Sequence, residues 1–444
     1  MKKSAENRPL CPGLPYMKKQ LLIASLGISH TVLEDEVKSH DNIMASAGEV
    51  RTNFHKNIYR KPELVNKLEG HDANVNGAAL IPGEDGVIST SNDRTLRVWL
   101  KRDSGQYWPS VCHQLPADGS SLHYSAMTRR VFVGLSDGKI MVRIFTKIMI
   151  NIYGLTHSDR VTATEFSVTC EWVLSTSIDK YLQWHCSESG RRLGAYKLDA
   201  QCLCLAFDES AKTVFVGDYS GTITVLKLED TECKFVSTLK GHTGSVHALS
   251  WDVLDARLFS GSFDESIICW DIGGQKGTAY DLNGHKGRVQ ALCYSPNTKS
   301  LFSAANDSSL VLWDMEADRQ ETPKWATSDT CMKCEKPFFW NIKQMWNEKT
   351  IGFRQHHCRK CGDAICDNCS KQSSTFPPMG YEYPVRMCDE CAQSVTTEQK
   401  VPLAMTFDSK HKVTCVDIDE RKKKLLTVGT NRIIKIWDIS PILA

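Results

Sequence analysis

The chain has 444 residues, of which 41% are hydrophobic and 24% charged, and its formal net charge is +2. This is ordinary globular composition, with length for two or three domains. The near-neutral charge, without long basic or acidic runs, argues against nucleic-acid binding through an overall positive field. No apolar stretch reaches the roughly 18 residues that a membrane-spanning helix needs.

Residues 1–55 lie outside any repeat, and we expect them to form a disordered N-terminal extension. Lysines precede a short apolar run at 21–28, which is near the lower limit for the core of a secretory signal peptide. Those lysines stand far from the start of the chain, and a clean small-x-small cleavage site is missing. We therefore favour an extension over a secretion signal.

Segments of similar sequence recur along the chain with a period near 43 residues. Three of them begin with Gly-His and reach a tryptophan 28 residues after that histidine, and a fourth runs between the same residue types. Two divergent copies fill the double gaps in this series, and a last copy ends the chain. The repeats resemble WD40 repeats, so seven copies imply a seven-bladed β-propeller of four-stranded antiparallel blades.

Four copies also share a serine four residues before a turn aspartate. Serine, histidine and aspartate together could serve a hydrolase, but one active site needs one triad, whereas a set repeated at one spacing serves every blade. The resemblance to WD40 repeats implies a buried hydrogen-bond chain within each blade. In the last copy Thr427 and Asn431 replace serine and aspartate. The four sets are His71, Ser89, Asp93 and Trp99; His157, Ser175, Asp179 and Trp184; His242, Ser260, Asp264 and Trp270; and His285, Ser303, Asp307 and Trp313.

The WD40 pattern also implies how the ring closes. In that pattern each repeat supplies the outer strand of one blade and three strands of the next, and this chain ends one strand short. The segment 61–68 stands before the first Gly-His as other outer strands do, so we expect it to complete the last blade. The propeller is thus expected in 56–320, with the closing strand and blades 1–6, and in 400–444, with the end of blade 6 and blade 7.

Four Cys-x-x-Cys pairs lie in an insertion of about 85 residues between the third and fourth strands expected for blade 6. Eight thiolates suffice for two closed tetrahedral zinc sites, and closed sites are structural. Disulfides are the alternative, but the pair spacing matches metal geometry. Ten other cysteines fall mostly in apolar strand-like segments, which indicates reduced core thiols and the cytosol. The pairs are Cys331/Cys334, Cys358/Cys361, Cys366/Cys369 and Cys388/Cys391.

The stretch RQHHCRKCG at 354–362 adds two histidines. Two complete four-cysteine sites leave both of them free, and a site of three cysteines and one histidine would strand a cysteine. The stretch resembles the R-(R/K)-H-H-C-R core of FYVE domains. RMC at 386–388 and WATSD at 325–329 resemble two further FYVE elements, R-V-C and W-x-x-D. We expect a FYVE zinc finger over 325–395.

FYVE domains bind phosphatidylinositol 3-phosphate on endosomal membranes, so the resemblance implies this ligand. It also implies crossed zinc sites, with the first and third pairs on one ion and the second and fourth on the other. A phosphate monoester favours charge-assisted donors. The family's apolar loop that enters the bilayer corresponds to Ile351 and Phe353. The implied headgroup ligands are Arg354, His356, His357, Arg359 and Arg386, with Trp325 and Asp329 as further candidates.

Three features depart from the FYVE pattern. Gln355 replaces a usual second basic residue, and the acid of WATSD falls at the fifth place. About ten extra residues, including FFWNIKQMW at 338–346, lengthen the first zinc loop. We expect these aromatic side chains to pack the small core; otherwise they widen the membrane contact.

A WD40 ring with a FYVE domain inserted before its last repeat resembles the WD repeat and FYVE domain-containing proteins, from about Met44 onward. This implies an endosomal adaptor or scaffold, without catalytic residues, at the early endosome and in the cytosol. The propeller would recruit signalling kinases or vesicle-traffic proteins in endocytic trafficking or signalling. Because one headgroup and a shallow insertion give modest anchoring, we expect a homodimer or a partner to add avidity.

Two other classes of protein fit the residues less well. A RING ubiquitin ligase needs a histidine among its zinc ligands, whereas this cluster is all cysteine. A zinc-ribbon reader of nucleic acid needs a basic domain, whereas residues 325–395 hold nine Lys and Arg against eight Asp and Glu.

Overall fold

The computed structural model describes residues 60–144, 147–153, 156–273 and 279–443. The expected N-terminal extension, 1–55, lies outside the described residues. Among the described helices, none is both long and apolar enough to cross a membrane.

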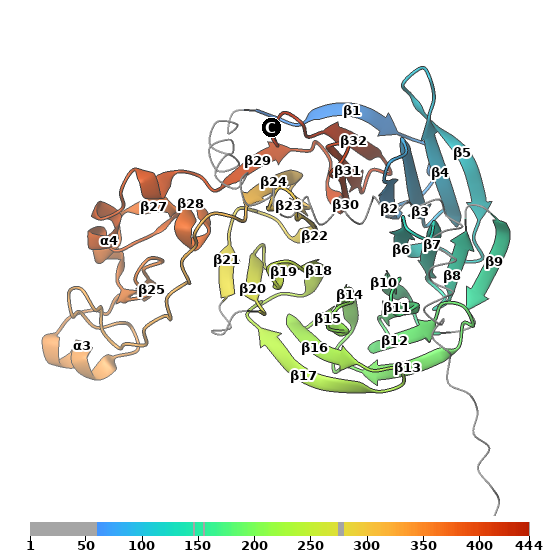
Figure 1. The fold of residues 1–444 in the computed structure, drawn as a ribbon. Helices are drawn as coiled ribbons and strands as arrows, with labels where there is room; N and C mark the ends of the chain where they lie inside the picture. The colour runs from blue at the N-terminus through green and yellow to red at the C-terminus, as the bar shows by residue number, and fades with distance from the viewer. Residues whose placement is uncertain (1–59, 145–146, 154–155, 274–278, 444) are drawn as a thin grey trace, which may run out of the picture. The chain divides into compact units, whose positions relative to one another are not determined.

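Seven four-stranded antiparallel sheets form the blades of a β-propeller, which confirms the predicted fold class (Figure 1). The first three blades are β2 (Val75–Ile81), β3 (Gly86–Ser91), β4 (Thr95–Lys101) and β5 (Tyr107–Gln114); β6 (Gly119–Ser125), β7 (Arg130–Leu135), β8 (Ile140–Ile144) and β9 (Lys147–Tyr153); β10 (Val161–Ser167), β11 (Trp172–Ser177), β12 (Tyr181–Cys186) and β13 (Arg192–Lys197). The next two are β14 (Cys202–Asp208), β15 (Thr213–Asp218), β16 (Thr222–Leu228) and β17 (Cys233–Lys240); β18 (Val246–Asp252), β19 (Arg257–Ser262), β20 (Ile267–Asp271) and β21 (Ala279–Leu282).

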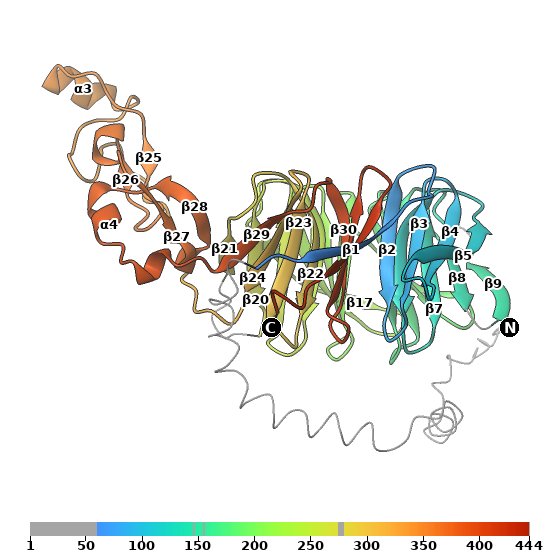
Figure 2. The same cartoon turned by 90° about the horizontal axis from the view of Figure 1, so that it is seen from above.

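The last two blades each take one strand from a distant part of the chain. The sixth is β22 (Val289–Ser295), β23 (Ser300–Ala305), β24 (Ser309–Asp314) and β29 (Ala404–Asp408); the seventh is β30 (Val413–Asp419), β31 (Lys424–Gly429), β32 (Ile434–Asp438) and β1 (Glu63–Leu68). The strand β1 runs antiparallel to β32, with Leu68 opposite Ile434, so the first and last strands of the ring share one sheet (Figures 1 and 2).

Burial explains why these segments are strands. Every residue of β3, β11 and β23 is buried, because the second strand of a blade lies between two neighbouring blades. The outer strands, such as β5 and β17, leave most of their residues exposed or half-buried. A fully buried Leu, Ile or Phe contributes about 1.5–3 kcal/mol to folding. The blades are therefore held together by apolar contact between them.

The turn between the second and third strands is built around the recurring aspartate. In the first blade the Asp93 carboxylate accepts hydrogen bonds from the N–H and the hydroxyl of Thr95, at 2.9 and 2.6 Å. The residue between them, Arg94, has a φ of +60°. A left-handed residue of this kind lets a tight hairpin turn follow the twist of its strands.

A buried hydrogen-bond chain links the strands of the first blade. Trp99 Nε1 donates to Ser89 Oγ at 2.8 Å, and that oxygen lies 2.7 Å from His71 Nε2. His71 Nδ1 lies 2.7 Å from Asp93 Oδ2. The fifth blade repeats this geometry with His242. In both blades the backbone N–H of the residue after the histidine also donates to the aspartate carboxylate. These contacts hold the Gly-His loop against the strands.

The sixth blade builds its chain differently. Trp313 donates to Ser303 Oγ at 2.8 Å, and His285 Nε2 lies 2.6 Å from the same oxygen. His285 Nδ1, however, meets Ser309 Oγ at 2.6 Å, and the Ser309 hydroxyl donates to Asp307 at 2.5 Å. The aspartate therefore acts on the imidazole through a serine.

The expected bond from Trp184 to Ser175 in the third blade is not formed. Trp184 Nε1 donates instead to the backbone oxygen of Asp230, at 3.2 Å. In the three Gly-His copies the tryptophan ring packs closely over that glycine. Here Thr156 takes the glycine's place, and the ring of Trp184 lies over Gly194 of β13, where a Cβ would come within 2.1 Å of it. A side chain at the loop thus redirects the indole.

The insertion leaves the propeller between two paired strands, since β24 and β29 are neighbours with Trp313 opposite Ala404. It contains mostly short elements. They are α3 (Ile342–Glu348), β25 (His356–His357), β26 (Ala364–Ile365), η1 (Asp367–Cys369), β27 (Ser373–Phe376), η2 (Pro377–Met379), β28 (Tyr381–Arg386), α4 (Asp389–Gln393) and η3 (Glu398–Lys400).

The inserted segment returns to the propeller beside β21. The N–H of Asn283 donates to Gly380 O at 2.8 Å, and the N–H of Glu382 donates to Asn283 O at 3.2 Å. Gly380 has a φ of +79°, and a Cβ there would come 1.7 Å from Asp281 O, so this contact requires glycine.

Two charged side chains are half-buried at the same junction. The guanidinium of Arg319 donates to Asp314 O at 2.9 Å and to Pro377 O at 3.4 Å, one acceptor on each side. Burial raises the pKa of Glu382 to about 7, although attraction to Arg319 opposes the rise. Backbone bonds and these charges, in addition to the two chain connections, join the insertion to the sixth blade and its neighbour.

Acid should weaken the propeller through its buried histidines. Burial lowers the pKa of His285 to about 4, whereas an unfolded histidine binds a proton below about 6.5. Stability that depends on a neutral His285 is therefore present at pH 7 and is lost as the pH falls toward 4. Replacing His285→Asn should cost about 1–3 kcal/mol at pH 7, because Ser303 loses a buried partner.

The cost of His285→Asn should shrink by about 1–2 kcal/mol between pH 7 and pH 5. Thermal unfolding of both proteins at each pH measures this difference, and any effect of pH on the cysteine clusters cancels because the two proteins share it. A cost that stays constant with pH would contradict the neutral, buried imidazole.

Candidate metal centres and headgroup surface

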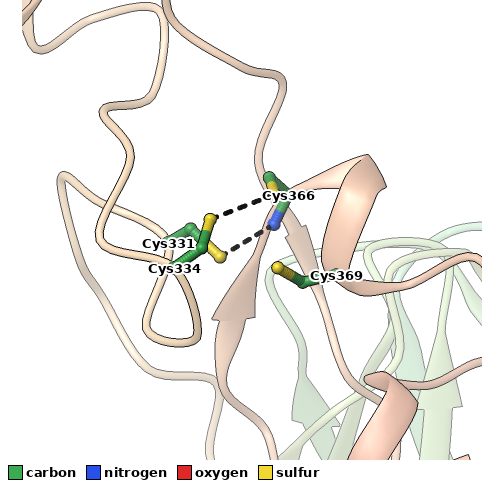
Figure 3. Close-up of side chains that lie close together, drawn as sticks. All are labelled: Cys331, Cys334, Cys366 and Cys369. Atoms are coloured by element: carbon green, nitrogen blue, oxygen red, sulfur yellow. Dashed lines mark hydrogen bonds between the residues drawn. The ribbon is translucent and has the colours of Figure 1, made fainter.

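The eight cysteines of the insertion come together as two separate clusters. Within each cluster the Sγ atoms all lie within 4.8 Å of one another. Figure 3 shows the first cluster, in which the pair from the loop before α3 faces the pair at η1. The clusters are Cys331, Cys334, Cys366 and Cys369, and Cys358, Cys361, Cys388 and Cys391.

The donor sets fit structural zinc. Four sulfurs on a tetrahedral zinc ion lie about 3.8 Å apart, given a bond length near 2.3 Å. Cys334 Sγ and Cys366 Sγ are 3.6 Å apart. Four cysteines complete the coordination of each ion and leave no open position, so these sites stabilise the fold rather than activate water.

Backbone N–H groups donate to a cysteine sulfur in each cluster. The N–H of Cys366 donates to Cys331 Sγ, and the N–H of Cys391 donates to Cys388 Sγ, both at 3.4 Å. Burial opposes ionisation of Cys331, yet backbone N–H groups around its sulfur lower the pKa of this thiol to about 7. A lowered thiol pKa favours the thiolate that binds metal.

The second cluster carries the basic residues. The strand β25 pairs with β26, His356 opposite Ile365, and runs directly into Cys358. The N–H of Arg359 donates to Arg386 O at 3.1 Å, which brings the end of β28 against the second cysteine pair. Residues far apart in sequence thus form one basic surface.

Trp325 organises one side of this surface. Its ring stacks on His357 with centroids 4.9 Å apart, and the guanidinium of Arg359 lies 4.6 Å from the centre of the indole. His357 Nε2 lies 3.0 Å from Ala326 O. The tryptophan thereby fixes the orientation of a histidine and an arginine, and cation–π attraction contributes to holding the arginine.

Asp367 lies close to two further basic residues of this surface, Arg386 and His356. Arg386 donates to its carboxylate at 2.8 Å and to Ser370 Oγ at 3.0 Å. His356 Nε2 lies 2.9 Å from the same carboxylate oxygen, but this buried nitrogen has no hydrogen-bond partner of acceptable geometry among the described residues. Burial, followed by repulsion from Arg386, lowers the pKa of His356.

Two of the candidate residues lie elsewhere. Asp329 accepts a hydrogen bond from Trp340 Nε1 at 2.9 Å, and its backbone oxygen accepts from Phe338, so it braces the first zinc loop. Phe353 is half-buried and packs against the core of the inserted domain, with Lys336 above its ring. Of the two residues expected to enter the bilayer, only Ile351 is well exposed, at 83%.

The expectation that the aromatics of the long first zinc loop fill the core is wrong for most of them. Phe338 is fully buried and belongs to the core. Phe339, Trp340 and Trp346 are half or more exposed. The short helix α3, which carries Trp346, has no buried residue.

Sequence reasoning missed Asp367 and the junction residues. Asp367 lies inside the Cys366/Cys369 pair, and its position beside a metal ligand was the signal in the sequence that it could lie near the histidines of β25. Arg319 and Glu382 stand outside any motif, and an isolated pair of opposite charges is too common to indicate a buried contact.

Comparison with protein families supports both parts of the chain. The model of the FYVE zinc finger matches residues 323–397. The model of the WD domain, G-beta repeat, matches residues 62–99, 233–271, 277–314 and 402–438. The solved WD40 beta propeller domain of Doa1 has a TM-score of 0.56 at 16% identity and covers 85% of this chain and 96% of that one, which shows the fold.

Curated relatives match across nearly the whole described chain. WD repeat and FYVE domain-containing protein 2 of Homo sapiens is 54% identical over 393 residues, which is 88% of this chain and 98% of the relative. Protein 1 of that name from Homo sapiens is 53% identical, covering 86% and 94%. Protein 2 from Caenorhabditis elegans is 40% identical, covering 85% and 93%. This chain belongs to the WD repeat and FYVE domain-containing protein family and combines a propeller of WD repeats with an inserted FYVE zinc finger.

Proposed function

We propose that this protein is an adaptor that attaches to early endosomes by binding phosphatidylinositol 3-phosphate, while its propeller recruits protein partners from the cytosol. The observation that carries the proposal is the basic surface on the second cysteine cluster, within a segment that matches the FYVE zinc finger. A FYVE zinc finger implies this lipid and this membrane. The roles of individual residues and the identity of the protein partners are what we propose in addition.

The proposed headgroup ligands differ in the contacts that their side chains already make within the chain. Arg354 is exposed, and the described part of the chain gives it no hydrogen bond or ion pair. Arg359 and Arg386 are held by Trp325 and Asp367 in positions set by the fold. A dianionic phosphate favours several charge-assisted donors at once. We assign Arg354 to the approach of the lipid, and the two held arginines to its bound phosphate.

His356 offers a further donor. Its Nε2 is buried and lacks a hydrogen-bond partner of good geometry, although Asp367 lies close. A buried polar atom without a partner costs free energy, which a bound phosphate oxygen would recover. His357 is already engaged by Ala326 and Trp325, and we assign it to orienting the surface.

The propeller is proposed to bind signalling kinases or vesicle-traffic proteins through its blade loops, since loops on a rigid scaffold are common binding sites. One headgroup and one inserted side chain give modest attachment to a membrane. We therefore propose that a homodimer or a membrane-bound partner supplies a second attachment.

The lipid assignment predicts selective flotation of the full-length protein with vesicles that contain phosphatidylinositol 3-phosphate. Vesicles with the 4-phosphate, 5-phosphate or bisphosphate relatives should capture it at least tenfold less well. Arg354→Ala and Arg359→Ala should each lower binding by about tenfold or more, because each removes a charge-assisted donor. Arg94→Ala is the matched control, since Arg94 is an exposed arginine of the propeller that pairs with Asp118. Equal binding to every anionic lipid would contradict the proposed specificity.

Zinc removal should abolish this lipid binding. A domain of about 70 residues has a thin core, and metal binding supplies much of its folding free energy. After treatment with a strong chelator, flotation should be lost, while thermal unfolding of the propeller persists at a similar temperature. Reducing agent alone should change neither, because no disulfide joins the cysteines among the described residues. Chelated protein that still binds the lipid would argue against a structural role for zinc.

A further inference from the structure

The extended first zinc loop presents large apolar side chains to solvent. Ile342 is 69% exposed and Trp346 is 84% exposed, and the two stand one turn apart on the same face of α3. Phe339 and Trp340, just before the helix, are 55% and 50% exposed. Single exposed apolar residues are ordinary, but a group of this kind on one short segment marks a contact surface.

The segment that carries these side chains is a formed helix. Asn341 caps its start by accepting a hydrogen bond from the N–H of Gln344 at 3.2 Å. At its end Lys349 takes the left-handed conformation, with its N–H bonded to the last turn. The apolar side chains are therefore held outward by an ordered element.

The helix is continuous with the loop that leads into the headgroup surface. The N–H of Thr350 donates to Met345 O at 3.1 Å, and the N–H of Gly352 donates to Met345 Sδ at 2.9 Å. Ile351 stands between these two bonds and is 83% exposed, and Arg354 follows two residues after Gly352. The exposed side chains of α3 and Ile351 therefore lie on one hydrogen-bonded segment that leads into the proposed lipid site.

The position of α3 within the inserted domain agrees with a surface that faces away from the propeller junction. In both views α3 lies at the opposite end of the domain from β27 and β28, the strands next to the junction (Figures 1 and 2). Residues 335–349 hold three lysines against two glutamates, and Lys343 and Lys349 are exposed on the helix or at its end. Cations beside apolar side chains favour contact with an anionic membrane surface.

We propose that α3 inserts into the lipid bilayer beside Ile351, as a second apolar anchor next to the bound headgroup. Trp346 and Ile342 would enter the boundary between headgroups and acyl chains, where an indole can bury its ring and keep its N–H in a polar environment. This inference rests on the proposed function, because it needs a membrane that the headgroup surface has already selected.

The test uses full-length, zinc-loaded protein and vesicles of phosphatidylcholine with and without phosphatidylinositol 3-phosphate. Trp346→Ala should weaken binding to the lipid-containing vesicles about tenfold, and Ile342→Ser combined with it should weaken binding further. Binding of a soluble short-chain form of the same lipid should not change in either variant. Trp346→Phe should restore most of the loss, because an aromatic side chain returns.

The matched control is Trp108→Ala, which removes a 55% exposed tryptophan from β5 of the propeller and should leave vesicle binding unchanged. Zinc content measured for every variant shows that the inserted domain is intact. Sedimentation measured for wild type and Trp346→Ala shows whether a second copy of the chain covers this face instead.

Each outcome decides the inference. Equal vesicle binding by wild type and Trp346→Ala would overturn it and leave the headgroup proposal standing. A dimer that Trp346→Ala converts to a monomer would assign the face to a second copy and would also overturn it. If wild type binds neither the vesicles nor the soluble lipid, the proposed function itself fails, and the membrane anchor fails with it.

Discussion

The crossed pairing of cysteines is the constraint on which the rest of the inserted domain depends. Because the first pair joins the third, and the second joins the fourth, the chain must pass through each cluster twice. That path carries Arg359 and Arg386, which are 27 residues apart, to a direct backbone hydrogen bond of 3.1 Å. The basic surface is thus a consequence of where the sulfurs meet.

The same constraint separates structural from binding residues. Each of the two clusters is complete with four cysteines, so the neighbouring histidines have no coordination role to fill. Instead, His357 stacks on Trp325 and His356 lies near Asp367. A small domain with little regular structure can hold side chains rigidly for recognition when its backbone is fixed by metal sites at both ends.

The propeller carries the inserted domain without a break in the sheet from which the insertion leaves. The insertion begins and ends at two strands, β24 and β29, that remain paired in one sheet. The strand β1 closes the ring at the seventh blade, so the sheet that receives the insertion is not the one that joins the two ends of the ring. Asn283, Gly380 and Arg319 then join the insertion to the propeller by hydrogen bonds.

Much of this arrangement was predictable because repetition in sequence reports repetition in structure. The Gly-His and Trp-Asp spacing indicated seven blades, and four Cys-x-x-Cys pairs indicated two metal sites. Single substitutions within the pattern were harder to interpret. Thr156 removes the glycine on which a tryptophan would pack, and Trp184 finds another partner. The exposure of Phe353 and of the loop aromatics could not be predicted, because sequence spacing does not report which apolar side chains of a small domain reach its core.

All eight metal ligands are expected to be cysteine sulfurs, which leaves His356 and His357 for the proposed headgroup surface. X-ray absorption at the zinc edge tests it most directly on the purified full-length protein. We predict two zinc ions per chain, each with four sulfur neighbours at about 2.3 Å and no lighter neighbour in the first shell. A nitrogen neighbour at about 2.0–2.1 Å would mean that a histidine coordinates zinc, and the basic surface would then have a different composition.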